Sequence, residues 1–174
     1  MNNFRLMSLA ACFPVMLQLP VTQAHEAKFK LAIVQGELGT EDLLAGNTQA
    51  SISKLERKKK WQNTYNSMMG LCVAYIKENR PVRSEDACTL AISRANSIPS
   101  NYSDASYLKS LSYSNRGVSR YQNNDLSGAL QDLNAAVQID SNRLTKNNLA
   151  LAEKHSIEAR ASINITNSTS ISAE

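Results

Sequence analysis

Two cysteines lie where a covalent bond could form in this 174-residue chain. Cys72 and Cys88 are eight residues before and eight residues after Arg80, where a turn is expected between two helices. Because a helix rises about 1.5 Å per residue, both cysteines lie ~12 Å along their helices, at the same level of an antiparallel hairpin. Both belong to the apolar stripe of their helix, so the spacing predicts a disulfide. The alternative is two small buried residues that happen to be cysteine.

This disulfide is expected to be structural. In the chain-entropy model, closing its loop stabilises the fold by about 3 kcal/mol. A redox-active pair is more often adjacent, as in Cys-x-x-Cys, and that motif is absent from the sequence. A stable disulfide also needs an oxidising compartment, so the N-terminus of the chain matters.

Residues 1–24 have the pattern of a secretory signal peptide. Arg5 gives a positive start, an apolar run follows, and small residues precede an expected cleavage site before His25. The sequence therefore predicts a soluble protein exported to a bacterial periplasm, a compartment that permits disulfides. The alternative is a lipid-anchored envelope factor, because Leu9 to Cys12 resembles a lipoprotein box and a lipid on Cys12 would bring membrane contact.

Residues with the types and spacing of a catalytic centre are missing from the sequence. It has two histidines, His25 and His155, and no histidine pair with metal-ligand spacing. A nucleophile elbow, a glycine-rich phosphate loop and a dinucleotide fingerprint are also absent. We therefore expect a protein that is not an enzyme and needs no metal or cofactor. A small exported hydrolase or transferase with an unrecognised site is the alternative, and a buried cluster of ionisable groups in a cleft would favour it.

The balance of charge argues against a nucleic-acid partner. The chain has 19 Lys and Arg residues and 15 Asp and Glu residues, for a net charge of +4. Proteins that bind nucleic acid concentrate more positive charge on one face. A basic run from Lys54 to Lys60, beside Trp61, resembles a patch for nucleic acid or an anionic surface, but such a run is usually a solvated helix face.

The stretch 110–143 predicts two short helices joined by a turn at Asn123–Asp125. Small residues fall where the two antiparallel helices must approach closely: Gly117, Ala129 and Ala136. This spacing resembles the tetratricopeptide repeat (TPR), a helical hairpin of ~34 residues with characteristic aromatic, Leu-Gly, Tyr, Ala, Phe and Pro positions. Arg116, Arg120 and Ser141 depart from that pattern.

Residues 65–98 predict a second hairpin of the same kind. Its first helix has apolar residues at helical spacing. Pro81 breaks this pattern, and Ser84 is the expected N-cap of the following helix. Cys72 then has the close-contact place that Gly117 has in the other hairpin.

We expect one all-α domain over residues 25–163, in which TPR-like antiparallel hairpins stack as a short right-handed array. The clearest repeats are 65–98 and 110–143, and residues 144–160 are expected to form a capping helix. Residues 164–174 have no apolar period and are expected to be a disordered tail.

The start of this domain fits more than one structure. Residues 27–34 are compatible with either a strand or a first helix. Residues 32–60 repeat the hairpin spacing loosely, with Gly39 in the place of Gly117. The second helix of that unit is too polar for a buried seam, so any repeat here is degenerate.

The resemblance implies binding rather than catalysis. In TPR proteins the first helices of the hairpins line an inner groove, and Asn115 and Asn148 recur at matched places on such helices. The resemblance implies that they hydrogen-bond the backbone of an extended peptide, although two polar residues that bind water fit equally well. Leu111, Val118 and Tyr121 would share the groove wall. The implied function is a scaffold for another protein or an extended peptide.

Overall fold

The computed structural model describes residues 28–57 and 64–171 of the chain. Within these ranges the chain forms seven helices and no strand, so the predicted all-α class is confirmed. The helices are α1 (Thr40–Leu44), α2 (Thr48–Glu56), α3 (Tyr65–Lys77), α4 (Pro81–Asn96), α5 (Ala105–Gln122), α6 (Leu126–Ile139) and α7 (Arg143–Ile171). The expected signal peptide with Cys12 and the basic residues Lys58 to Lys60 lie outside the described residues.

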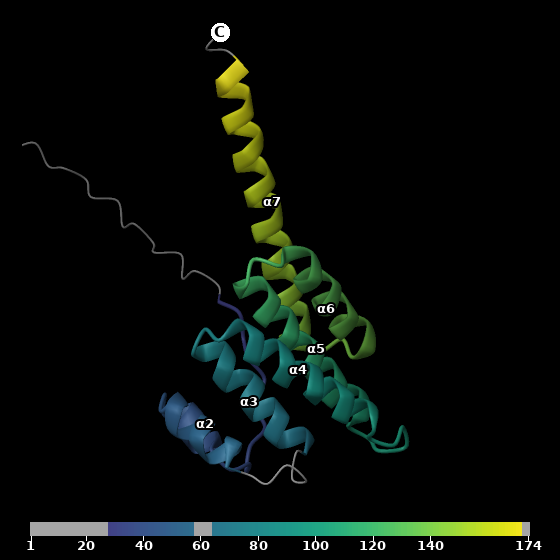
Figure 1. Cartoon of the computed structure of the whole chain (residues 1–174). Helices are drawn as coiled ribbons and strands as arrows, with labels where there is room; N and C mark the ends of the chain where they lie inside the picture. Colours follow the sequence, from purple (N-terminus) through teal and green to yellow (C-terminus); the bar gives the residue numbers. More distant parts are fainter. Residues whose placement is uncertain (1–27, 58–63, 172–174) are drawn as a thin grey trace, which may run out of the picture.

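The helices stack in chain order (Figure 1). Each helix packs against the next, and the most extensive contacts join α5 to α6 and α3 to α4. The first helices of these two pairs, α3 and α5, also contact each other, and α5 contacts α7 as well. The later part of α7 projects beyond the rest of the stack in Figure 1. Consequently α3, α5 and α7 follow one another along one side of the molecule.

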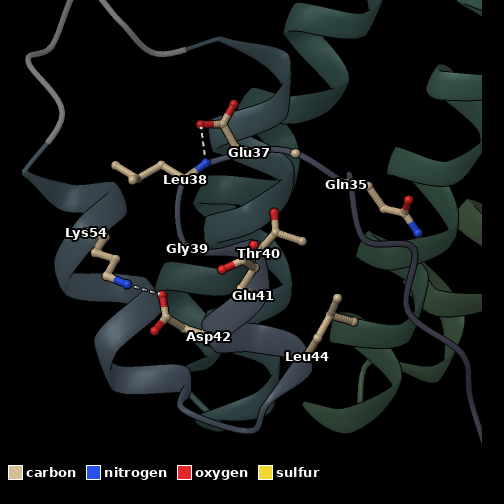
Figure 2. A pocket seen from close by; sticks show the side chains of 10 residues that line it. Gln35, Glu37, Leu38, Gly39, Thr40, Glu41, Asp42, Leu44 and Lys54 are labelled. Carbon is tan, nitrogen blue, oxygen red and sulfur yellow. Dashed lines mark hydrogen bonds and ion pairs between the residues drawn. The ribbon is translucent and has the colours of Figure 1, made fainter.

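The described chain begins with an extended segment, residues 28–34, that is neither strand nor helix. We call it the N-terminal segment; it runs along the stack in Figure 1 (purple). A turn follows in which Gly36 and Gly39 have φ angles of 74° and 84°, a left-handed conformation that glycine adopts most easily. This turn leads into α1 (Figure 2). The predicted match of Gly39 to Gly117 is therefore wrong, because Gly39 precedes α1 whereas Gly117 lies inside α5.

The connection between α3 and α4 differs from the prediction. α4 begins at Pro81, because the first helical position tolerates a residue without an N–H. Ser84 is therefore not the N-cap: it lies about one turn inside α4. Its hydroxyl donates to the Pro81 carbonyl (2.9 Å) and pairs with the hydroxyl of Ser119 on α5 (2.7 Å). Ser84 thus helps to join two helices instead of starting one.

The central hairpin follows the prediction. The turn between α5 and α6 falls at Asn123–Asp125, and Asp125 caps α6 by accepting a hydrogen bond from Gly128 N (2.8 Å). Gly117 lies so close to α6 that an added Cβ atom would be 2.7 Å from Leu133 Cγ. The predicted close approach of the two helices is therefore present.

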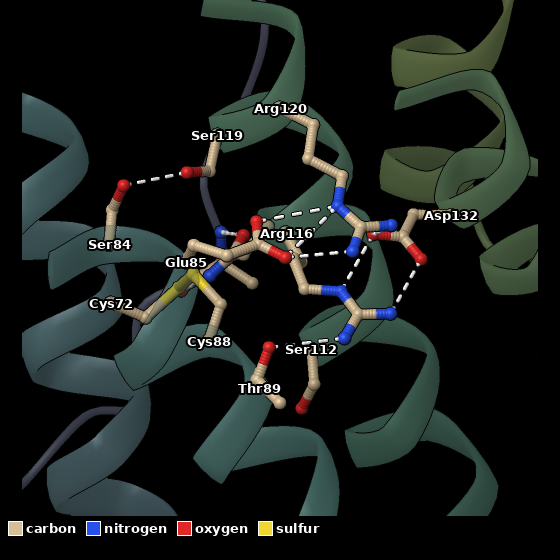
Figure 3. Close-up of a disulfide and its surroundings, with 12 residues drawn as sticks. Cys72, Ser84, Glu85, Cys88, Thr89, Ser112, Arg116, Ser119, Arg120 and Asp132 are labelled. Carbon is tan, nitrogen blue, oxygen red and sulfur yellow. Dashed lines mark hydrogen bonds and ion pairs between the residues drawn. A yellow bond between two sulfur atoms is a disulfide. The ribbon is translucent and has the colours of Figure 1, made fainter. Parts of the chain in front are cut away.

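The predicted disulfide joins Cys72 in α3 to Cys88 in α4 (Figure 3). The two Cα atoms are 4.8 Å apart, and both side chains are fully buried. They belong to the main core cluster, which draws most of its residues from α2, α3, α4 and α5. The bond therefore crosses the hairpin at the centre of the core.

The last helix is longer than the sequence pattern predicts. α7 spans Arg143–Ile171, whereas the pattern predicts a capping helix over 144–160 and a disordered tail from residue 164. No Gly or Pro interrupts the chain between Arg143 and Ile171, so the backbone has no strong helix breaker. The helix therefore continues to Ile171, past the predicted start of the tail.

Candidate peptide-binding face

Asn115 and Asn148, the two asparagines expected to bind a peptide, bind the extended N-terminal segment of their own chain. Asn115 Oδ1 accepts a hydrogen bond from Ala32 N (2.8 Å), and Asn115 Nδ2 donates to Ala32 O (2.9 Å). Asn148 binds Lys30 N and Lys30 O in the same way, at 2.9 and 2.8 Å. Asn115 is 0% exposed and Asn148 is 1% exposed. The alternative in which these residues only bind water is therefore wrong.

Each asparagine side chain makes the two hydrogen bonds to one backbone residue that a neighbouring β-strand would make. The two bonds that one amide makes to one residue match the pair that a residue exchanges across an antiparallel ladder. Lys30 and Ala32 are two positions apart, so their N–H and C=O groups point to the same side of an extended chain. Since α5 and α7 are in contact and carry one asparagine each, they bind alternate residues of one segment. Turning either amide around would replace both bonds with unfavourable contacts, which fixes its orientation.

Asn148 is held in place by the neighbouring helix. Its Nδ2 also donates to Ser114 Oγ (3.0 Å), and Ser114 is fully buried on α5. Ser114 directly precedes Asn115 in the chain. Helix α5 therefore supplies one backbone-binding amide and the acceptor that orients the other. The two asparagines form one hydrogen-bonded unit between α5 and α7.

An aromatic cluster lies beside the first backbone contact. The Phe29 ring centroid is 4.6 Å from that of Tyr121 and 6.0 Å from that of His155. Tyr121 Oη and His155 Nδ1 are 2.6 Å apart. Tilted and edge-to-face pairs at these distances are favourable. We call the side chains of Asn115, Tyr121, Asn148 and His155 the α5–α7 face.

The remaining predicted wall residues have other surroundings. Leu111 is buried in the core cluster, which also contains Ala32 of the N-terminal segment. Val118 is 1% exposed and is buried outside that cluster, where it contributes to helix packing. His155 is a face residue that the sequence reasoning missed. Its position seven residues after Asn148, on the same side of a helix, is the signal that could have found it.

The N-terminal segment is bound along one edge. A third backbone contact follows the two asparagine contacts, because Val34 O accepts a hydrogen bond from Thr40 Oγ1 (2.8 Å). The three contacts fall on alternate residues and therefore share one edge of the extended chain. On the other edge, the backbone groups of Leu31 and Ile33 form no hydrogen bond within the described ranges. No strand of the described ranges pairs with the segment, so side chains hold it there.

Ionisable side chains cluster between α4, α5 and α6 (Figure 3). Asp132 is 2% exposed and accepts hydrogen bonds from Arg116 Nε and Nη2 at 2.7 and 2.8 Å. Arg120 bridges Asp132 (3.0 Å) and Glu85 (2.7 Å). The hydrogen bond to Glu85 is the main reason why the pKa of Arg120 is raised above its usual value. Every charge in this cluster has an opposite partner.

Two residues that depart from the TPR pattern belong to this cluster. Arg116 and Arg120 stand where the pattern has Leu and Tyr, and their guanidinium groups are satisfied by Asp132 and Glu85. Buried charges are tolerated when they are paired and hydrogen-bonded. A buried cluster of ionisable groups in a cleft would favour a hydrolase or transferase. These four groups instead pair with one another, as in a structural ion-pair network, and none of them lines the hollow at the turn before α1.

A hollow of about 640 Å³ lies at the turn before α1 (Figure 2). It is lined by residues 35–42, Leu44 and Lys54. Lys54 Nζ pairs with Asp42 Oδ2 at 2.6 Å, so the basic run begins with a paired charge. Within the described part of the chain, no group of three or more His, Cys, Asp or Glu residues could hold a metal ion. None of the helices described there has the length and apolarity of a membrane span.

No protein-family model, curated protein or solved structure matches this chain. Its function must therefore be inferred from its own contacts, chiefly those of Asn115 and Asn148. These are contacts to main-chain groups, which any extended polypeptide presents.

Proposed function

We propose that this protein is a non-catalytic scaffold that binds another protein or a peptide as an extended segment. The observation that carries the proposal is the paired hydrogen bonding of alternate backbone residues by Asn115 and Asn148. Amide side chains fixed in this way suit the main chain of a polypeptide. They do not suit nucleic acid, whose phosphates call for positive charge.

In this proposal the helices form a short right-handed array of TPR-like hairpins, residues 65–98 and 110–143, followed by α7. The close approach at Gly117 supports the assignment, because the repeat needs a small residue there. The contacts of α3 with α5 and of α5 with α7 support it too. They bring the first helices to one side, where the resemblance implies the binding groove.

The backbone contacts supply affinity without strong sequence selection. A buried hydrogen bond contributes about 0.5–1.5 kcal/mol net, so the four asparagine bonds together favour a bound segment by roughly 2–6 kcal/mol. Ordering the segment opposes this gain, because each residue that becomes fixed loses conformational entropy. Reversible binding is therefore expected.

The proposed place of action is the bacterial periplasm, reached through a signal peptide at residues 1–24. The buried disulfide supports an oxidising compartment. The mass of the mature chain distinguishes a protein cleaved before His25 from one that carries a lipid on Cys12.

The test uses the full-length chain and a labelled peptide that copies residues 28–34, KFKLAIV. One version carries an N-methyl group on the amide of its Ala32 equivalent, and a matched version carries it on the Leu31 equivalent. The first loses the hydrogen that Asn115 accepts, whereas the second is changed on the opposite edge. Binding is followed by fluorescence anisotropy up to about 1 mM chain, the effective concentration of a short tether.

The proposal predicts that the unmodified peptide and the version methylated at the Leu31 equivalent bind. The version methylated at the Ala32 equivalent should bind at least about tenfold more weakly, because a buried acceptor loses its partner and the methyl group also fills its place. Equal weakening by both methyl groups, or no binding at the highest concentration, would contradict the proposal.

A further inference from the structure

We propose that the N-terminal segment is a built-in competitor for the α5–α7 face, and that this face selects extended peptides with an aromatic residue three positions before a small one. The inference rests on the proposed function and names the class of ligand and its regulation. It follows from the way in which residues 28–34 lie against the helices.

Selection can act only where side chains of the segment meet the protein. Lys28 and Lys30 have exposed side chains, so these positions accept many residue types. The ring of Phe29 packs against Tyr121 and His155, which favours an aromatic residue there. The backbone bonds then set the register, since Asn148 binds the residue directly after the aromatic one.

The small residue is required at the position of Ala32. Its backbone is held on both sides of its Cα atom by Asn115, so it cannot shift away from the helices. Its side chain is 7% exposed and belongs to the core cluster. A larger side chain at this position would overpack the core. Leu31 and Ile33 pack against the same cluster while partly buried, so these positions favour apolar residues.

The segment is attached as a ligand is, through side chains of helices that also pack on one another. Its hydrogen bonds with the described residues all go to the side chains of Asn115, Asn148 and Thr40. A turn with two left-handed glycines links it to α1. The helices pack on one another, and a disulfide closes the α3–α4 hairpin, so the stack does not depend on the segment for its connections. Such a segment can open locally while the rest stays folded.

A tethered ligand lowers the apparent affinity of any free one. A short flexible tether keeps its ligand at an effective concentration of about 1 mM. A free peptide binds only the fraction of molecules whose face is open, so its apparent Kd equals the intrinsic Kd divided by that fraction. Weakening the segment should therefore strengthen the binding of a free peptide, although the residue changed is not part of the face.

The experiment compares full-length wild type, Phe29→Ser and a control, Lys28→Ser, whose side chain is exposed. The probes are labelled KFKLAIV and KKFLAIV, which have the same composition but place the aromatic residue two positions, not three, before the alanine. Phe29→Ser should bind KFKLAIV about tenfold more tightly than wild type, because the segment loses its ring contact. Lys28→Ser should equal wild type. KKFLAIV should bind all three proteins at least about tenfold more weakly than KFKLAIV.

Results other than these would each refute one part of the proposal. If wild type and Phe29→Ser bind KFKLAIV equally and still discriminate the N-methyl peptides, the competition is refuted and the proposed function stands. If neither protein binds, the proposed function itself fails. Equal binding of the two peptides refutes the selection rule. A wild-type dimer in light scattering that Phe29→Ser dissociates would assign the segment to a second copy. Should Phe29→Ser not fold, Phe29→Leu keeps an apolar side chain without the ring, and a gain of about threefold is then expected.

Discussion

The two central hairpins reach the same close approach of helices by different chemistry. The α3–α4 hairpin is crossed by the disulfide between Cys72 and Cys88. The α5–α6 hairpin instead has Gly117 against Leu133, together with paired charges around Asp132. One hairpin depends on the redox state of its surroundings, and the other depends on packing and charge. The fold sets where the two helices of each hairpin come closest. The residues at that point, a disulfide or a glycine beside paired charges, decide which change destabilises the hairpin.

The hairpins also differ in what lies beside them. Asn115 directly precedes Arg116 and Gly117, so the α5–α6 hairpin supports the α5–α7 face. Neither cysteine contributes to that face. Damage to the α5–α6 hairpin should therefore reduce both stability and peptide binding, while loss of the disulfide in the α3–α4 hairpin should reduce stability alone.

The largest effect is expected from Asp132→Ala. This change leaves Arg116 and Arg120 without their shared buried partner, and removing one member of a buried ion pair costs about 3–5 kcal/mol. Urea denaturation measures the free energy of unfolding. Glu85→Ala is the matched control with a smaller loss, because Arg120 keeps Asp132. A loss below about 1 kcal/mol in Asp132→Ala would show that the cluster does not hold the hairpin.

Removing the disulfide should have the next largest effect. The double variant Cys72→Ala/Cys88→Ala should lose about 3 kcal/mol of stability through the more disordered unfolded chain. It should bind the KFKLAIV peptide as well as wild type does at a temperature where both are folded. In the wild type, alkylation under denaturing, non-reducing conditions should leave Cys72 and Cys88 unlabelled. Labelling of both would contradict the bond.

High pH should weaken the contact between the two hairpins. Burial raises the pKa of Tyr65 from 10.0 to about 12, and its hydroxyl donates to Leu108 O on α5 (2.9 Å). Between these pH values the unfolded chain loses a proton that the folded protein keeps. The free energy of unfolding should therefore fall with rising pH, by up to about 1.4 kcal/mol per unit. Tyr65→Phe should reduce this slope, and the exposed control Tyr102→Phe should keep it. Part of the slope should remain, because burial also raises the pKa of Tyr75. An unchanged slope in Tyr65→Phe would contradict the assignment.

Gly117→Leu should give the smallest of these losses, about 2 kcal/mol. Since an added Cβ would already lie 2.7 Å from Leu133 Cγ, the larger side chain overpacks the seam, a change that typically costs about 1–3 kcal/mol. Gln131→Leu, at an exposed position of α6, is the control and should be nearly neutral. Leucine has a better helix propensity than glycine, so the change would stabilise a helix in which position 117 packs against nothing. A more stable Gly117→Leu protein would therefore contradict both the close approach and the TPR-like assignment.

The elements that could be predicted from the sequence are those with local signals. Both hairpins have apolar residues at helical spacing and recognisable turns, and Cys72 and Cys88 are symmetric about Arg80. The continuation of α7 was not predicted, because its polar composition has no apolar period although it also has no helix breaker. Ser84 was misjudged because proline can itself begin a helix.

The sequence predicts the asparagines of the site but not the backbone that they bind, for a physical reason. Asn115 and Asn148 were found through their places on first helices, but their partners Ala32 and Lys30 lie 83 and 118 residues away in the chain. A short apolar run such as residues 28–34 fits a strand or a helix equally well, and nothing local shows what will hold it. The pairing of Arg116 with Asp132 also depends on how two helices face each other. From the sequence alone, this arginine is only a departure from a pattern.

The central claim is that the α5–α7 face binds alternate residues of an extended backbone. Amide hydrogen exchange of the full-length chain tests this claim most directly. The amides of Lys30 and Ala32 donate to Asn148 and Asn115 and should exchange slowly. The amides of Leu31 and Ile33 lie on the opposite edge and should exchange faster. An alternating pattern, measured residue by residue by NMR, is the predicted result. Uniform exchange across residues 28–34, or slow exchange at Leu31 and Ile33 alone, would contradict it.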